Sequence, residues 1–413
     1  MPKLFFIILS VFITTPILAW DNHATMTQAA IDQSSNLNAY LNQQIPTESL
    51  ADFLKTTTHS LPQKLNQIEQ ELRRAEAGYR PLPENLTYAP AHSDCAQDLV
   101  ICFKKSLRIN LNASLDAARN ENISLRDALI TASSQPDFGF DLYLYEDSGT
   151  AFGKYYGFKT QPLGISTTEF GTQILFHMST YQDDPQILNF IPRLNEDYPE
   201  YRAIQYFELS RFAANAHHPY WSAVFLGWGL HYIQDMTQPY HAILSNGASS
   251  DDLAIIISQA KQGNPLPLQA FIALQTDRHI LLEGLTDYIL SATNDSLYRP
   301  ILISALKNTA LDHGLHSCEV RPGYIRQHVD LRMAKTSAEY QAMLLATMPA
   351  SFVSDPSFNA GEFNAYDDLF YTDMNEAQRV QFTEQVVKAM QWFGAYTRNC
   401  LKQYKVYSPK VKV

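Results

Sequence analysis

Apolar residues recur at helical spacing along most of the chain. Strict alternation of apolar and polar residues, which is typical of a half-buried strand, is confined to the short run 142–145. The pattern therefore predicts an all-α protein. One predicted helix has Leu61, Leu65, Ile68 and Leu72 on a single face. Further predicted helices cover residues 103–133, 198–238, 251–261, 267–291, 298–311 and 375–398.

Two long segments have no helical period. Residues 134–172 are rich in Gly, Pro, Phe and Tyr, and residues 349–374 precede the last predicted helix. An irregular segment of this length inside a domain is usually functional. Nothing in the composition marks a domain boundary, so we expect a single helical domain.

The first nineteen residues are typical of a secretory signal peptide. Lys3 precedes an apolar run over residues 4–13, and Ala19 stands at the expected cleavage position. This apolar run is too short to span a bilayer, and no other apolar run in the sequence is long enough to do so. We therefore expect an exported protein, secreted or periplasmic, without a transmembrane anchor, whose mature domain covers residues 20–413.

Charge and cysteine content narrow the class of protein. The formal net charge of −11 argues against a protein that holds nucleic acid by neutralising phosphates. The four cysteines form an even set, which favours disulfides in an exported chain. Three pairings are possible, and the most economical one joins Cys95 to Cys102 and Cys318 to Cys400.

The clearest chemical signal lies in residues 231–241. His231 and Asp235 are four apart, so they share one face of a helix. Pro239 cannot continue that helix, and the chain therefore delivers His241 from just beyond its end. Two imidazoles and a carboxylate placed in this way suit Zn²⁺. The alternative is a helix with a satisfied histidine and a capping aspartate.

Cleavage after Ala19 would create a second group of metal ligands. The new terminus at Trp20 would carry a free amine with a pKa of about 7.7–8.0, from which a metal can displace the proton at neutral pH. The amine and the carbonyl oxygen of Trp20 can close a five-membered chelate ring. His23 follows closely enough to add a third donor.

These segments resemble the zinc-dependent phospholipase C family. Residues 225–242 resemble its central motif, residues 23–32 its first helix, and residues 377–393 its last helix. The family's fold, a single large all-α domain, is shared with zinc-dependent single-strand nucleases. The matched segments are a small part of the chain, and we expect insertions at about residues 40–130 and 138–176.

The resemblance implies nine ligands and three zinc ions. An aspartate and a histidine are expected before the central motif, and a His-x-x-x-Glu pair after it. Asp141 remains an alternative to Asp137, because both follow the start of the irregular segment. One ion would be held by Asp137, His177, His231 and Asp235, one by His241, His279 and Glu283, and one by Trp20, His23 and Asp235.

The resemblance also implies a reaction. A monomeric phospholipase C would cleave phosphatidylcholine-like glycerophospholipids to diacylglycerol and a phosphorylated head group. Zinc lowers the pKa of a bound water from about 15.7 to about 7, and Asp137 would accept the proton of that water. Two alternatives stay open, a single-strand nuclease and a zinc-stabilised helical protein without turnover. Glu283 favours the lipase, because the nucleases tend to end the ligand series with aspartate.

Overall fold

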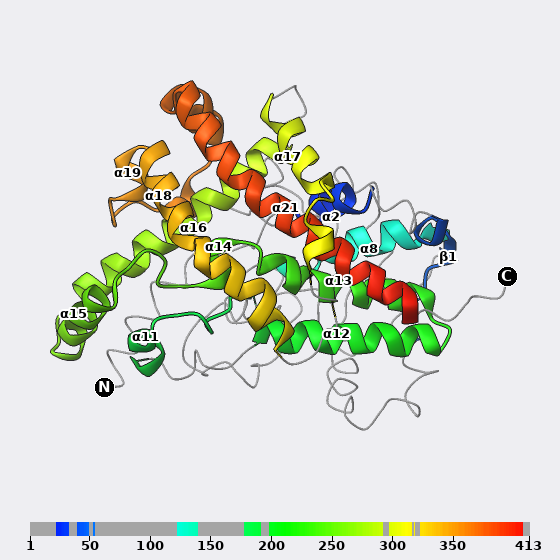
Figure 1. Cartoon of the computed structure of the whole chain (residues 1–413). Helices are drawn as coiled ribbons and strands as arrows, with labels where there is room; N and C mark the ends of the chain where they lie inside the picture. Colours follow the sequence, from blue (N-terminus) through cyan, green and yellow to red (C-terminus); the bar gives the residue numbers. More distant parts are fainter. Residues whose placement is uncertain are drawn as a thin grey trace, which may run out of the picture.

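Helices make up most of the chain that the computed structural model describes, and they pack into one compact domain (Figure 1). The described residues also include one two-stranded antiparallel sheet, β1 (Gln44–Pro46) with β2 (Asn122–Ser124). The prediction of a mainly α-helical domain is confirmed. The described residues are 22–32, 39–48, 53, 122–138, 177–190, 198–291, 297–315, 318 and 323–407.

Helix α13 (Pro219–Asp235) runs through the centre of the domain, and all its residues from 220 to 235 are buried. A helix that is apolar on every side is expected in such a position. Helices α12 (Tyr198–Asn215) and α8 (Leu125–Ser134) pack along it. The approach of α8 requires Gly227, because a Cβ there would lie 2.5 Å from the Cβ of Ala132.

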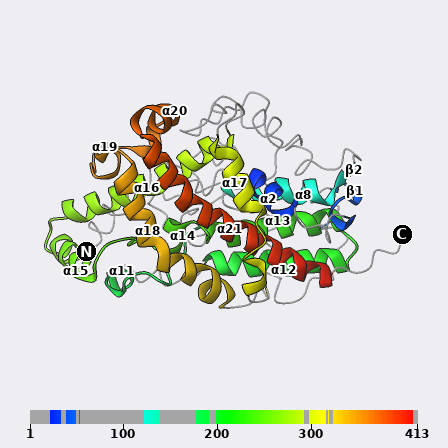
Figure 2. The same ribbon diagram turned by 45° about the horizontal axis from the view of Figure 1, so that its top comes forward.

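The second half of the core is built by α16 (Leu266–Ser291), α18 (Leu331–Thr347) and α21 (Glu376–Tyr407). In both ribbon views α21 crosses the domain diagonally, and α17 (Tyr298–Lys307) and α2 (His23–Asp32) pack against it (Figures 1 and 2). The long helix therefore joins the beginning of the described chain to its later part.

Arg398 on α21 fastens these helices together. Its guanidinium is buried, pairs with Asp312 at 2.9 Å, and donates to the carbonyls of Ala30 and Leu306 at 3.2 and 2.6 Å. A buried charge needs such compensation. The end of α2 and the end of α17 are thus held by one side chain.

The remaining elements are short or peripheral, and several of them lie in the irregular stretch before α21. They are η2 (Pro136–Phe138), α11 (Pro185–Phe190), α14 (Pro239–Ala242), α15 (Ser250–Lys261), η5 (Asp312–Gly314), η6 (Ile325–Asp330), α19 (Ala350–Val353), η7 (Ala360–Glu362), α20 (Tyr366–Asp368) and η8 (Leu369–Asp373).

The helix predicted over residues 198–238 is wrong in its extent, because two helices occupy this range. His217 between them has a φ of 65°, which no helix interior contains. Pro219 then opens α13, a position where its missing N–H is not needed. The chain after Asp235 turns before α14 begins.

Three further predicted helices have wrong ends. The last one, predicted over 375–398, continues to Tyr407. Of the helix predicted over 103–133, residues 103–121 lie outside the described part of the chain. Residues 122–124 form a strand, and α8 begins after them because the Ser124 hydroxyl accepts the N–H of Asp127. The helix predicted over 298–311 ends at Lys307, where Arg398 binds the last carbonyls. Helix α18 was missed, although its buried residues Met333, Tyr340 and Leu344 have helical spacing.

The disulfide predicted between Cys318 and Cys400 is present. Several predictions fall outside the described residues. They concern Cys95 and Cys102, residues 1–19 with Trp20, and the helix predicted from Leu61. No helix in the described part of the chain is long and apolar enough to cross a membrane.

Candidate metal centre

The turn between α13 and α14 brings the central motif together. His231 and Asp235 lie one helical turn apart near the end of α13, and His241 comes from α14. The Gln238 side chain accepts the N–H of Tyr240 and so caps α14. All three motif side chains are fully buried. Charged and polar side chains are rarely buried to this extent unless they are paired.

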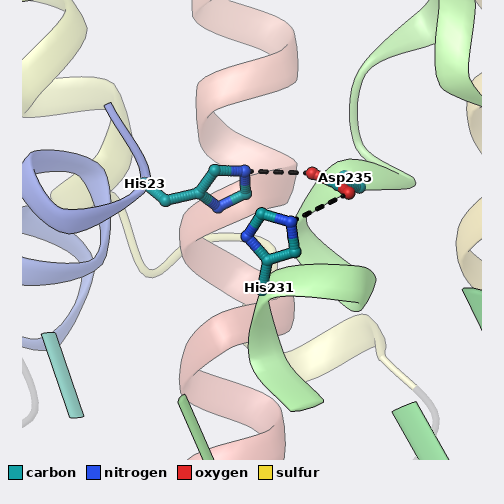
Figure 3. Close-up of side chains that lie close together, drawn as sticks. All are labelled: His23, His231 and Asp235. Atoms are coloured by element: carbon teal, nitrogen blue, oxygen red, sulfur yellow. Dashed lines mark hydrogen bonds and ion pairs between the residues drawn. The ribbon is translucent and has the colours of Figure 1, made fainter. Parts of the chain in front are cut away.

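The first group contains His23, His231 and Asp235 (Figure 3). His23 projects from α2, and the other two project from α13. Oδ1 of Asp235 lies 3.0 Å from Nε2 of His23, and Oδ2 lies 3.3 Å from Nε2 of His231. The first helix and the central helix therefore meet at one carboxylate.

The second group contains Asp137, His177 and His231. Asp137 lies in η2, directly after α8, and its Oδ1 is 3.4 Å from Nε2 of His231 and 3.9 Å from Nδ1 of His177. The two imidazole nitrogens are 2.9 Å apart. The structure thus brings Asp137 into the group, while Asp141 lies outside the described residues.

The third group contains His241, His279 and Glu283. Nε2 of His241 lies 3.0 Å from Nε2 of His279, and Oε1 of Glu283 lies within 3.1 Å of both nitrogens. His279 and Glu283 share one face of α16, as their spacing predicts.

Asp235 connects the three groups. Besides its contacts in the first group, its Oδ2 lies 2.7 Å from Nδ1 of His177 and 4.0 Å from Nδ1 of His241. We refer to the eight residues of the three groups as the metal centre. They are His23, Asp137, His177, His231, Asp235, His241, His279 and Glu283.

The geometry fits metal ions. Tetrahedral zinc with ligands at about 2.0–2.2 Å holds its donor atoms roughly 3.3–3.6 Å apart, and the contacts within the groups lie on both sides of this range. Nε2 of His177 is buried without a hydrogen-bond partner among the described residues, but it is Nδ1 of this ring that faces the second group. The support for metal ions therefore comes from the type and spacing of the donor atoms.

Two hydrogen bonds set the ring orientation of the histidines. Nδ1 of His231 donates to the carbonyl of Ser133 at 2.8 Å, and Nδ1 of His23 donates to Oε1 of Gln234 at 2.8 Å. A carbonyl oxygen can only accept, so the proton of each ring lies on Nδ1. The lone pair of each Nε2 is therefore directed at Asp235, as metal-binding histidines require.

Burial keeps most imidazoles of the metal centre neutral. It lowers the pKa of His231 to about 3 and also lowers the pKa values of His177 and His279. His241 differs, because its hydrogen bond to Glu283 and the nearby charge of Asp235 outweigh burial and raise its pKa. Neutral imidazole is the form that binds metal.

Two carboxylates of the metal centre, those of Glu283 and Asp235, stay ionised. Burial disfavours the charge of Glu283, but His279 and His241 lower its pKa to about 2. Burial also opposes ionisation of Asp235, yet the adjacent His231 and His177 hold its pKa well below the usual range. Anionic carboxylates next to neutral imidazoles form a donor set suited to a divalent cation.

Sequence reasoning missed the residues that support the ligands. Gln234 binds His23, Ser133 binds His231, and Gln238 donates to Oε1 of Glu283 at 2.9 Å. One signal was available, because Gln234 is a polar residue inside an otherwise apolar helix and directly precedes Asp235.

The structure therefore assembles eight of the nine predicted ligands, and the ninth, Trp20, lies outside the described residues. No family model, curated protein or solved structure matches the chain.

Proposed function

We propose that the protein is a secreted, zinc-dependent phospholipase C, and that it hydrolyses the glycerol-side phosphodiester bond of phosphatidylcholine-like lipids. One observation carries the proposal. Eight residues that match the ligand motif of that family, spread from position 23 to position 283, surround one buried centre. Trp20 would complete the set through its terminal amine and carbonyl.

Zinc bound by these residues would neutralise the phosphodiester oxygens and acidify a water molecule. The protein's own part begins with Asp235, whose two oxygens face different histidines and fix the spacing of the groups. Asp137, whose Oδ1 lies 3.4 Å from Nε2 of His231, would accept the proton released by the attacking water. Ser133 and Gln234 keep two ring nitrogens directed at the centre.

Two features favour a lipid substrate over a nucleic acid. Glu283 occupies the last ligand position, where the related nucleases tend to have aspartate. The formal net charge of −11 also opposes binding of a long polyanion. A single phosphodiester at a membrane surface requires no such extended basic surface.

The test compares two substrates with one enzyme. Mature protein that begins at Trp20 is loaded with zinc and assayed on phosphatidylcholine micelles and on single-stranded DNA. We expect diacylglycerol and phosphocholine from the first substrate and no nucleotides from the second. The Asp235→Asn variant is the control for contaminating activity. Release of nucleotides without diacylglycerol would identify a nuclease, and no product from either would exclude both enzymes.

A further inference from the structure

Asn22, the residue before His23, is bound to the helix that carries the third group. Its Nδ2 donates to Oδ1 of Asp287 and, at 2.9 Å, to Oγ of Ser291. Its Oδ1 accepts the hydroxyl of Thr25 at 3.0 Å, so its amide is oriented with the nitrogen toward α16. The contacts with Asp287 and Ser291 join positions that are 265 and 269 residues apart in the sequence.

Asp287 lies on the same face of α16 as two residues of the metal centre. His279, Glu283 and Asp287 follow one another at four-residue intervals, so they lie on one face over successive turns. The first two belong to the third group of the metal centre, and the third binds Asn22. One rigid helix therefore sets the distance between the third group and the start of α2.

We infer that Asp287 is a positioning residue, which fixes the start of α2 through Asn22 so that His23 meets Asp235 in the metal centre. The inference rests on the proposed function in one respect, namely that the centre binds metal. Asp287 itself touches no residue of the centre in any described contact and acts through Asn22.

The rest of α2 has independent attachments. The N–H of Ala24 donates to the Ser134 hydroxyl at 2.9 Å, and the carbonyl of Ala30 accepts from Arg398 at 3.2 Å. Loss of Asp287 should therefore leave the helix docked and loosen its first residues. A positioning role thus differs from a general structural role, which would lower the stability of the whole protein.

The experiment measures zinc release from the loaded, mature protein to a colorimetric chelator, with wild type compared with Asp287→Ala. We expect one ion per chain to leave faster, by up to about 10–100-fold, since this is the loss of metal affinity that follows removal of a supporting residue. The remaining ions should leave at the wild-type rate. The melting temperature of the zinc-free variant should equal that of the zinc-free wild type.

A second variant removes the donor of the same hydrogen bond instead of its acceptor. Asn22→Ala should release the same ion faster, and the double variant should be no faster than the single ones, because all three lack one interaction. Asp367→Ala is the matched control, since that carboxylate binds Tyr288, the neighbour of Asp287 on α16. It should leave zinc release unchanged.

Three results would overturn the inference: unchanged zinc release from both Asp287→Ala and Asn22→Ala, equal acceleration of all ions, or a lower melting temperature of the zinc-free Asp287→Ala protein. A failure of the proposed function is distinguishable, because the release assay needs no substrate. A protein that binds zinc but cleaves no lipid would still show the selective loss.

Discussion

Oε1 of Gln234 lies 2.8 Å from Nδ1 of His23, and this contact joins the central helix to the first helix. The amide of Gln234 cannot turn over freely, because its Nε2 donates to the hydroxyls of Thr27 and Thr397 at 2.9 and 3.0 Å. Three helices thus orient one amide, and the amide orients one ligand.

Replacing Gln234 by Ala should weaken the ion held by His23. Without an acceptor at Nδ1 the ring can rotate or change tautomer, and we expect the affinity of one zinc ion to fall about 10–100-fold. Competition with a chelator measures this loss. Thr397→Val removes a single contact of the amide and should have a smaller effect. Equal affinities in Gln234→Ala and wild type would contradict the role.

Asp235→Asn should be more damaging than His279→Ala. Asp235 contacts histidines of all three groups, whereas His279 belongs to the third group alone. If the loaded protein holds three ions, we expect about one to remain in Asp235→Asn and about two in His279→Ala. Metal analysis after dialysis gives the numbers, and circular dichroism shows whether each variant folds. Equal zinc contents would exclude a bridging role for Asp235.

One extra alanine before Trp20 should remove one zinc ion and most of the activity. The added residue turns the Trp20 amine into an amide, whose lone pair is delocalised and binds metal poorly. The new amine would lie roughly 3.5 Å further along the chain. Zinc content and turnover are compared with the protein that begins at Trp20. Full values for both would show that the terminal amine of Trp20 is not a ligand.

The zinc-free protein should lose stability as the pH falls from 6.5 toward 3. His231 has a pKa of about 3 when folded, against an ordinary value of 6.5, so only the unfolded chain binds this proton in that interval. Stability then falls by at most about 1.4 kcal/mol per pH unit for each such group. Glu283, lowered to about 2, adds a further loss below its ordinary value of 4.5. The lowered pKa values of His177 and His279 act in the same sense as that of His231, and the raised pKa of His241 acts in the opposite sense.

Urea denaturation in the presence of a chelator, at pH 7, 5.5 and 4, checks this prediction. A free energy of unfolding that stays constant or rises on acidification would contradict it. Zinc should add stability without flattening the dependence between pH 7 and 5.5, because the zinc-bound folded state binds no more protons than the zinc-free one.

Gly227→Ala should destabilise the protein by about 1–3 kcal/mol, the usual effect of overpacking. A Cβ at this position would lie 2.7 Å from the carbonyl of Leu129 and would push α8 away from α13. Gly314→Ala is the control, because nothing lies within 4 Å of a Cβ there. Thermal or urea denaturation measures both. Since Ser133 on α8 holds His231, zinc affinity should fall in Gly227→Ala as well.

Local rules were sufficient for part of the site. The four-residue spacing of His231 and Asp235 predicted their shared helix face, and Pro239 predicted that His241 follows after a turn, although α13 already ends at Asp235 and Pro239 opens α14. Asp137 and His177 have no comparable local pattern, and only the family resemblance pointed to them. Both nevertheless lie in the second group.

Other features were beyond local rules. Gln234 and His23 are 211 residues apart, and Asn22 and Asp287 are 265 apart, so only the packing of helices brings them together. The break before α13 was different, because Pro219 in the sequence indicates a helix start. The break was missed because the apolar periodicity continues across residues 198–238, and this long pattern outweighed the single Pro219.

The hydrogen bond between Ala30 and Arg398 spans 368 residues of the chain, and it has a consequence for biosynthesis. Chains are made from the N-terminus onward, so α2 leaves the ribosome long before the helix that fastens it exists. During nearly all of translation, His23 therefore lacks the packing that α21 provides in the folded protein. We expect the centre to close only after synthesis ends and, for an exported chain, after translocation. Zinc would then be acquired from the destination compartment rather than from the cytosol, and the proposed phospholipase activity would be absent from the cell that makes the protein.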